Sequence, residues 1–508
     1  MNAPTPSWRL GELRFDDTTQ PLSPEKRQRL IEALSTALPP DCLVCDEEPL
    51  KPYECDGLSG YRRLPAAVAL PRSEAQVAEV LKICSALEVP VVPRGAGTGL
   101  SGGATPHRGG VVLSTARLRK ILAIEPQARR ARVQPGVRNL AISEAAAPYG
   151  LYYAPDPSSQ IACSIGGNVA ENSGGVHCLK YGLTVHNILQ VRGLTIAGEP
   201  VVFGSEAFDS PGLDLLSLLI GSEGMLAVVT EVTVKLVPKP ALARVVMASF
   251  DDVEKAGQAV ADLIGAGIIP AGLEMMDKPM TAAVEEFVHA GYDLKAAAIL
   301  LCESDGTPEE VEEEIGRMKA VLSQSGATEL TVSASEAERL RFWSGRKNAF
   351  PASGRISADY YCIDGTIPRR RLGEMLRKIA SLEKKYGLRC LNVFHAGDGN
   401  LHPLILFDAA KPGEFEATEK FGAEILETCV AFGGTITGEH GVGLEKINSM
   451  CVQFSQDERL AFLAVKRAFD PEGLLNPGKT IPTLHRCAEY GRMHVQSGVL
   501  RFPELERF

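Results

Sequence analysis

The sequence lacks a long hydrophobic run, an excess of positive charge and any closely spaced set of cysteines. Without a stretch of about 18 apolar residues, no transmembrane helix is expected. The 53 Lys and Arg are outnumbered by 63 Asp and Glu, giving a net charge of −10, which argues against nucleic-acid binding and a polybasic membrane anchor. The N-terminus shows no charged segment followed by an apolar one, so we predict no signal peptide and a cytoplasmic protein.

Cysteines are scattered along the chain rather than clustered. Twelve occur in 508 residues, and in a cytoplasmic protein we expect free thiols rather than disulfides. Cys42 and Cys45 form one Cys-x-x-Cys pair without the second pair that a structural zinc site needs. No cysteines are spaced to hold an iron–sulfur cluster, so such a cluster would have to come from a partner.

Length and patterning predict an α+β protein of two or three domains. Residues 1–60 form a lead-in. Residues 61–238 combine short strands with glycine clusters, and prolines at 238 and 240 mark a boundary. In residues 239–480, strands at 243–250 and 296–303 alternate with helices at 253–266 and 309–323. This order predicts an antiparallel sheet covered on one face. Residues 481–508 form a polar tail.

The first glycine cluster is Pro93-Arg94-Gly95-Ala96-Gly97-Thr98-Gly99-Leu100-Ser101, directly after a predicted strand. Residues 97–102 formally match Gly-x-Gly-x-x-Gly, but the segment runs into another strand, whereas a Rossmann loop must open a helix. No Lys-Ser/Thr pair closes it as a P-loop. Either it is a surface loop, or its backbone N–H groups form a nest for a pyrophosphate.

Two further glycine-rich segments support the pyrophosphate interpretation. Pro155-Asp156 precedes a run of small residues and amides from Ser164 to Gly175, and Glu223-Gly224 precedes a strand. Small residues are needed where backbone lies against a large planar ligand. Three such clusters in one domain indicate one extended ligand. The neighbouring His177, His186 and Tyr181 are expected to pack rather than react.

Two segments near the C-terminus predict a metal site. His395-Ala-Gly-Asp398-Gly-Asn-Leu-His402 and Gly-Glu439-His440-Gly supply two imidazoles and a carboxylate, a common ligand set for a divalent metal that keeps an open position. Asp398 is expected to orient one of the histidines. His440, next to the presumed ligand Glu439, is expected to act as a general base; the alternatives are a third imidazole ligand of the metal or a core histidine.

These motifs together resemble the FAD-linked 2-hydroxy-acid dehydrogenases of the vanillyl-alcohol-oxidase type, over nearly the whole chain. The resemblance is greatest to the flavin-binding D subunits of bacterial glycolate oxidases. It implies an FAD-binding domain built from two α+β subdomains, and a cap domain that forms the substrate side. The implied FAD contacts are Pro93, Gly95, Ala96, Gly97, Thr98, Gly99, Leu100, Ser101, Pro155, Asp156, Ser164, Gly166, Gly167, Asn168, Ala170, Asn172, Gly174, Gly175, Glu223, Gly224, Val229 and Asn476.

The resemblance also sets expectations for the chemistry. Arg346 would hold the substrate carboxylate through bidentate bonds; the alternatives are that Lys347 does so, or that Arg346 is a surface residue paired with a glutamate. The glycine loop carries no histidine, and His107 lies beyond it, so non-covalent FAD is expected. Ala227 stands where relatives often have glycine, and its single methyl group should not prevent cofactor binding. The metal would be zinc, manganese or iron.

The implied reaction is oxidation of a small 2-hydroxy acid, glycolate to glyoxylate in the first instance. The alternatives are D-lactate or D-2-hydroxyglutarate as substrate, or a flavin scaffold subunit without catalysis. Relatives that act on diacids carry lysine where Cys362 stands, which favours a small monoacid. Partners implied by the resemblance are a second flavin subunit and an iron–sulfur subunit, with peripheral attachment to the membrane through them.

Overall fold

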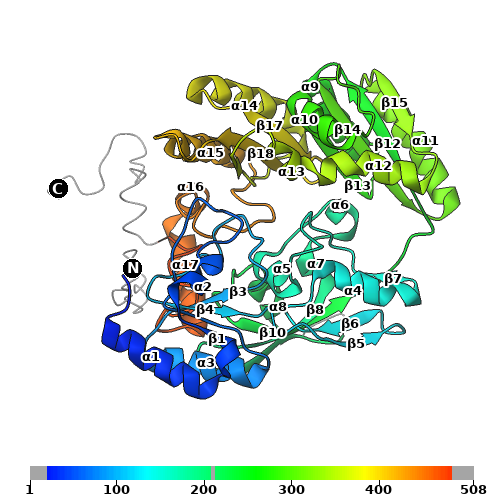
Figure 1. The fold of residues 1–508 in the computed structure, drawn as a ribbon. Coiled ribbons are helices and arrows are strands. Elements are labelled where there is room, and N and C mark those ends of the chain that lie inside the picture. Colours follow the sequence, from blue (N-terminus) through cyan, green and yellow to red (C-terminus); the bar gives the residue numbers. More distant parts are fainter. Residues whose placement is uncertain (1–19, 208–211, 483–508) are drawn as a thin grey trace, which may run out of the picture.

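The computed structural model describes residues 20–207 and 212–482 and divides into two bodies. Figure 1 shows the N-terminal domain, coloured blue to cyan, below the cap domain, coloured green to brown. The expected polar tail lies outside the described residues apart from 481 and 482. Within the described ranges, no helix combines the length and apolar character needed to cross a membrane.

The first half of the N-terminal domain is a four-stranded sheet with helices on it. β2, β4 and β3 run parallel, and β1 pairs antiparallel with β2 at the edge. α3 begins where the Ser73 hydroxyl, as its N-cap, accepts a hydrogen bond from the Gln76 backbone N–H. The elements are α1 (Pro24–Ala37), β1 (Leu43–Val44), α2 (Glu47–Leu50), β2 (Ala67–Ala69), α3 (Glu74–Ala86), β3 (Val91–Arg94) and β4 (Val111–Ser114).

The described part of the expected lead-in belongs to this sheet's core. Leu30, Leu34 and Cys42 are buried in the same cluster as Val91 and Val111. Because β1 extends the sheet and α1 packs on α3, residues 20–60 are built into the N-terminal domain and do not precede it as a separate unit.

The second half of the N-terminal domain is an antiparallel five-stranded sheet in the order β5-β6-β10-β8-β9. Its core is formed by alternating strand residues such as Val232 and Val234, packed against Ile165 and Val169 of α5. The elements are β5 (Ile121–Glu125), β6 (Arg130–Val133), α4 (Asn139–Ala146), β7 (Leu151–Tyr152), α5 (Ile165–Glu171), α6 (Cys178–Tyr181), α7 (Thr184–Asn187), β8 (Ile188–Leu194), β9 (Pro200–Gly204), α8 (Leu215–Leu219), β10 (Val228–Lys235) and β11 (Val237–Pro238).

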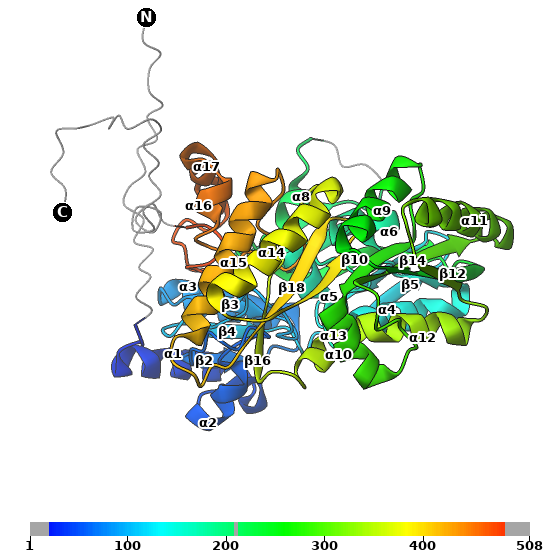
Figure 2. The same cartoon turned by 90° about the horizontal axis from the view of Figure 1, so that it is seen from above.

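The cap domain is built on a seven-stranded antiparallel sheet, visible from above in Figure 2. Its order is β15-β12-β14-β13-β17-β18-β16, so the strands carrying His395 and His402 pair directly. The strands are β12 (Leu242–Phe250), β13 (Gly272–Asp277), β14 (Ala298–Gly306), β15 (Glu329–Val332), β16 (Asp359–Cys362), β17 (Cys390–His395) and β18 (Asn400–Phe407).

Helices cover both faces of this sheet, so the expectation of one covered face is wrong. Val246 and Ala248 of β12 pack under α9, α11, α14 and α15, whereas Val245 and Met247 pack under α10, α12 and α13. A strand with both faces buried carries few polar residues to reveal its period. The helices are α9 (Val253–Gly265), α10 (Lys278–Val288), α11 (Pro308–Gln324), α12 (Glu336–Lys347), α13 (Ala349–Ser353), α14 (Leu372–Tyr386) and α15 (Glu414–Ala431).

After the cap sheet the chain returns to the N-terminal domain. α16 (Met450–Gln453) and α17 (Gln456–Phe469), orange in Figure 1, lie beside the blue sheet. The buried Lys466 Nζ donates to the carbonyl oxygens of Met225 at 2.7 Å and Leu475 at 2.6 Å. The last part of the expected cap range, 239–480, therefore packs against the FAD-binding side.

The cysteines mostly follow expectation. Ten in the described ranges carry free thiols, and eight of these are buried, including Cys302 and Cys429. Cys451, on α16, is disulfide-bonded, so the expectation of free thiols is wrong there. Spacing along the chain carries no information on such a pairing.

Candidate active site

A cavity of about 510 Å³ lies between the two domains. The first glycine loop, the start of α5 and the segment before β10 form one side, and α12 and α13 with the predicted metal motifs form the other. The expected FAD contacts that line it are Pro93, Gly95, Ala96, Gly97, Thr98, Gly99, Leu100, Ser164, Gly166, Gly167, Asn168, Ala170, Glu223, Gly224 and Val229.

Glycine is required in the first loop for two physical reasons. Gly97 adopts a φ of +73°, where other residues are strained, and a Cβ there would lie 2.2 Å from the Arg94 guanidinium. A Cβ on Gly95 would lie 2.4 Å from the Ser164 hydroxyl of the second segment. The two segments touch, so they form one continuous surface on this side of the cavity.

The other expected FAD contacts lie behind the cavity wall rather than on it. The buried Ser101 accepts from the Leu444 backbone N–H through its carbonyl oxygen, and Asp156 pairs with His177. Asn172 caps α5 and its Oδ1 accepts from the Val185 backbone N–H. These residues support the lining segments. The remaining expected contacts that do not line the cavity are Pro155, Gly174, Gly175 and Asn476.

Two of these residues connect the cavity wall to distant segments. A Cβ on Gly174 would lie 2.3 Å from Glu439 Oε2, so this glycine makes room for a predicted metal ligand. Asn476 is buried, and its Nδ2 donates to the carbonyl oxygens of Gly103 at 3.2 Å and Glu223 at 2.6 Å. Asn476 thereby connects the first and third glycine clusters through hydrogen bonds.

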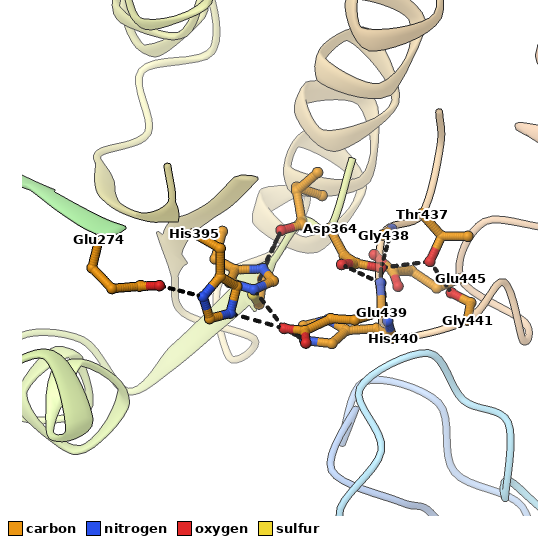
Figure 3. A network of polar contacts seen from close by, with 12 residues as sticks. Glu274, Asp364, His395, Thr437, Gly438, Glu439, His440, Gly441 and Glu445 are labelled. Carbon is orange, nitrogen blue, oxygen red and sulfur yellow. Dashed lines mark hydrogen bonds and ion pairs between the residues drawn. The ribbon is translucent and has the colours of Figure 1, made fainter. Parts of the chain in front are cut away.

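The three predicted metal ligands converge on one point. Figure 3 labels two of them, His395 and Glu439, whose side chains point toward each other. His395 Nε2 lies 3.2 Å and His402 Nε2 2.8 Å from the same oxygen, Glu439 Oε1. Their donor atoms all lie within 4.8 Å of one another. The adjacent strands β17 and β18 bring the two histidines together, and the loop after α15 supplies Glu439.

The contacts behind these ligands favour a cation at this point. His395 Nδ1 donates to Glu274 at 2.6 Å and His402 Nδ1 to the Ile363 carbonyl at 3.4 Å. The neutral imidazoles would then direct two Nε2 lone pairs at one carboxylate oxygen, which repels them unless a positive charge lies between. Burial opposes a charge on His395, yet Glu274 and Glu439 outweigh it and raise the pKa of His395 to about 10. The donor set fits a divalent metal.

The loop bearing Glu439 and His440 is held by two buried carboxylates. Asp364 is fully buried and accepts from the backbone N–H groups of Gly438, Glu439 and His440 (Figure 3). Beyond His440, Glu223 of the N-terminal domain accepts from two more backbone N–H groups, those of Val442 and Gly443, each at 2.7 Å. The loop is therefore fixed from both domains at once.

His440 is placed to accept a proton. Its ring stacks on that of His402, with centroids 4.8 Å apart and planes within 5°. Burial lowers the pKa of His440 to about 4, so the ring is neutral near pH 7. Its Nδ1 is buried and has no hydrogen-bond partner among the described residues. A neutral imidazole that lines the cavity can accept a proton, so His440 is a candidate general base.

Arg346 lines the cavity and is buried. It is paired with a carboxylate that the sequence did not indicate. Its Nε donates to Glu274 Oε2 at 2.5 Å, and the same glutamate holds His395 through its other oxygen. Arg346 Nη1 is buried with no hydrogen-bond partner in the described ranges. This leaves one guanidinium donor for a ligand carboxylate. The neighbouring Lys347 also lines the cavity and is exposed.

Comparisons with known proteins agree with this arrangement. A family model for the C-terminal domain of FAD linked oxidases matches residues 239–480, and a model for an FAD binding domain matches residues 65–204. The glycolate oxidase subunit GlcD of Escherichia coli K12 is 63% identical over 482 residues, covering 95% of this chain and 97% of that protein. The chain belongs to the FAD-linked oxidase family. A D-lactate dehydrogenase of Anaerostipes hadrus is 32% identical, covering 89% of this chain and 96% of that protein.

The fold of this FAD-linked oxidase is that of the vanillyl-alcohol-oxidase type, as predicted. The structure of p-cresol methylhydroxylase superposes with a TM-score of 0.78 at 18% identity, covering 91% of this chain and 98% of that one. The protein is an FAD-dependent oxidoreductase, and the predicted similarity to the glycolate oxidase D subunit is confirmed. The similarity to catalytic FAD-linked oxidases disfavours the non-catalytic scaffold alternative.

Sequence reasoning missed the residues that orient the site. Glu274, and not Asp398, contacts His395 Nδ1. Asp364 and Glu223 hold the loop around His440. One signal was available: Glu274 stands in an otherwise apolar segment, Gly-Leu-Glu-Met-Met, and a charge in a buried strand needs a buried partner.

Proposed function

We propose that this FAD-linked oxidase oxidises a small 2-hydroxy acid, in the first instance glycolate to glyoxylate. The observation that carries the proposal is the single cavity lined both by the glycine segments of the FAD-binding domain and by Arg346, His395, Glu439 and His440. Its similarity to the E. coli glycolate oxidase subunit supports glycolate as the substrate. When bound, non-covalent FAD accepts the hydride from the substrate Cα.

The proposed roles follow from the contacts. The free Nη1 of Arg346 binds the substrate carboxylate, and Glu274 fixes the direction of the guanidinium. His440, neutral because of its burial, takes the hydroxyl proton. His395, His402 and Glu439 would hold a divalent metal (zinc, manganese or iron), which would polarise the substrate hydroxyl.

Electrons must then leave the flavin. In the described ranges, two groups of side chains lie close enough to share a metal ion: Cys362, His402 and His440, and His395, His402 and Glu439. Neither group has the four cysteines that hold an iron–sulfur cluster. We therefore propose that this chain works as the flavin subunit of a larger enzyme, with a second flavin subunit and an iron–sulfur subunit. These partners would bring a cytoplasmic chain to the inner membrane.

The test is anaerobic stopped-flow reduction of the bound flavin by glycolate, D-lactate and D-2-hydroxyglutarate. We expect glycolate to reduce it fastest, and reduction only by a larger acid would overturn the substrate while keeping the site. D-Lactate is the second candidate because of the similarity to the A. hadrus enzyme. Failure of all three acids would refute the proposed activity.

The same assay tests the base. His440→Ala should retain FAD but lose flavin reduction, since no other neutral imidazole with a free nitrogen borders the cavity in the described ranges. His289→Asn, at an exposed position after α10, is the control and should behave as the wild type. Undiminished reduction in His440→Ala would remove His440 from the mechanism.

A further inference from the structure

His177 bridges the two domains outside the cavity. Figure 1 shows α6, which His177 precedes, at the upper edge of the N-terminal domain against β13 of the cap. His177 Nδ1 donates to Asp156 Oδ2 of its own domain at 2.8 Å, and Nε2 donates to Glu303 Oε1 of the cap at 3.1 Å. One imidazole thus joins a carboxylate from each domain.

Both ring nitrogens donate only if His177 is charged, and its surroundings favour this state. Burial opposes the charge, but Asp156 and Glu303 outweigh burial and raise the pKa of His177 well above its usual value. A charged imidazole between two carboxylates forms directional, charge-assisted hydrogen bonds. The bridge therefore fixes the relative orientation of Asp156 and Glu303 as well as joining the two domains.

The cap end of the bridge is anchored on α12. Glu303 is 2% exposed, and its second oxygen, Oε2, accepts from Arg339 Nη1 at 2.7 Å and from the Trp343 indole N–H. Both donors belong to α12, so Glu303 connects His177 to this helix. The Trp343 ring is buried and lies next to Gly272 of β13, where a Cβ would come within 3.2 Å of it.

α12 also carries Arg346, the proposed carboxylate ligand. Arg339, Trp343 and Arg346 are spaced by four and three residues, so they share one face of the helix. Two buried glutamates from neighbouring strands hold this face: Glu303 of β14 binds its first half and Glu274 of β13 its last turn. Only the Glu303 end is joined to the FAD-binding domain by His177.

A second bridge between the domains provides a comparison. Lys180 Nζ pairs with Asp305 Oδ1 at 2.5 Å, and the Tyr181 hydroxyl donates to Asp305 Oδ2 at 2.7 Å. Asp305 lies near the end of β14, and its carboxylate bonds to α6 alone among the described contacts. This bridge holds the domains together without contacting α12.

We propose that His177 is a positioning residue, which sets the placement of Arg346 relative to the flavin through Glu303 and α12. The inference rests on the proposed role of Arg346. The metal ligands and Arg346 all belong to the cap, so substrate binding should survive loss of the bridge. What should change is the distance between the bound substrate and the flavin, and a displacement of about 1 Å can lower a rate about 100-fold.

The test compares His177→Phe, which keeps the ring shape but has no nitrogen, with Lys180→Met, which removes the other bridge. For each variant, four quantities are measured: FAD affinity, Tm, oxalate binding by flavin absorption, and the limiting rate of flavin reduction by whichever acid reduces the wild type. We expect His177→Phe to lower the rate at least about tenfold with FAD and oxalate affinities within twofold of wild type. Lys180→Met should lower Tm and leave the rate within twofold.

Equal rate losses in both variants would mean that His177 only stabilises the contact between the domains, and would overturn the inference. A wild-type rate of flavin reduction in His177→Phe would overturn it too. If that variant does not fold, Glu303→Gln replaces it, because the amide oxygen can still accept from α12 while the charge facing His177 is lost. The expected rate loss is the same. If no acid reduces the wild-type flavin, the proposed function fails, and this inference fails with it.

Discussion

Replacing Glu274 by glutamine should lower both the thermal stability of the cap domain and the affinity of its proposed metal site. Both oxygens of this 1% exposed carboxylate are used, one by Arg346 Nε and one by His395 Nδ1. Glu274→Gln keeps the size but leaves the buried Arg346 without its counter-charge. Removing one partner of a buried pair costs about 3 kcal/mol or more. For a domain of this size, that corresponds to a Tm lower by roughly 6–12 °C.

The same substitution should affect the metal because Glu274 orients a ligand. Loss of such a partner costs roughly 10- to 100-fold in metal affinity. Tm from scanning calorimetry and zinc affinity from competition with a chelator measure the two effects. Glu329→Gln, at an exposed position on β15 of the same sheet, is the matched control. A Tm within about 2 °C of wild type together with unchanged zinc affinity would refute the shared role of Glu274.

Three further outcomes are expected. Gly174→Ala should lower zinc affinity while FAD stays bound, since its Cβ would displace Glu439 Oε2; Gly316→Ala, with open space around it, is the control. Asn476→Leu should weaken FAD binding in a fluorescence titration, because the Glu223 carbonyl loses its donor at about 1 kcal/mol, while the Gly103 carbonyl keeps only Lys479 Nζ. Burial would raise the pKa of Glu303, but His177 and Arg339 outweigh it and lower this pKa to about 2. Stability should therefore decline as pH falls from about 4.5 to 2, and Tm in Glu303→Gln should decline less over this range.

The sequence predicted those elements whose signal is local. The helices at 253–266 and 309–323 and the strand at 243–250 are present within a few residues of their expected bounds. The central strands β17 and β18 were not read as strands, because every residue in them is buried and no alternation remains. The second glycine segment forms a helix, α5, although Gly166 and Gly167 disfavour one, because Ile165 and Val169 bury a face in the sheet core.

In the candidate site, too, the residues with a local sequence signal were predicted and those without one were missed. His395, His402 and Glu439 were predicted together because short motifs in polar, glycine-rich surroundings are recognisable without a fold. The residues that orient them come from distant parts of the chain: Glu274 lies on another strand, and Asp364 follows β16. A buried acid in a sequence indicates that a partner exists, but which partner depends on the order of strands in the sheet, and no local pattern encodes that order.

The proposed catalytic residues are connected to both domains. The cap alone supplies His440, but the backbone just after it is held by Glu223, whose own backbone is tied to Asn476 beneath the FAD cavity. A shift of the FAD-binding domain relative to the cap would therefore move the proposed base as well as the cofactor. On the opposite side, His177 joins the domain to α12 and Arg346. The proposed base and the proposed carboxylate ligand are thus each connected to the FAD-binding domain by a separate buried contact, and these two contacts would hold a bound substrate in one orientation.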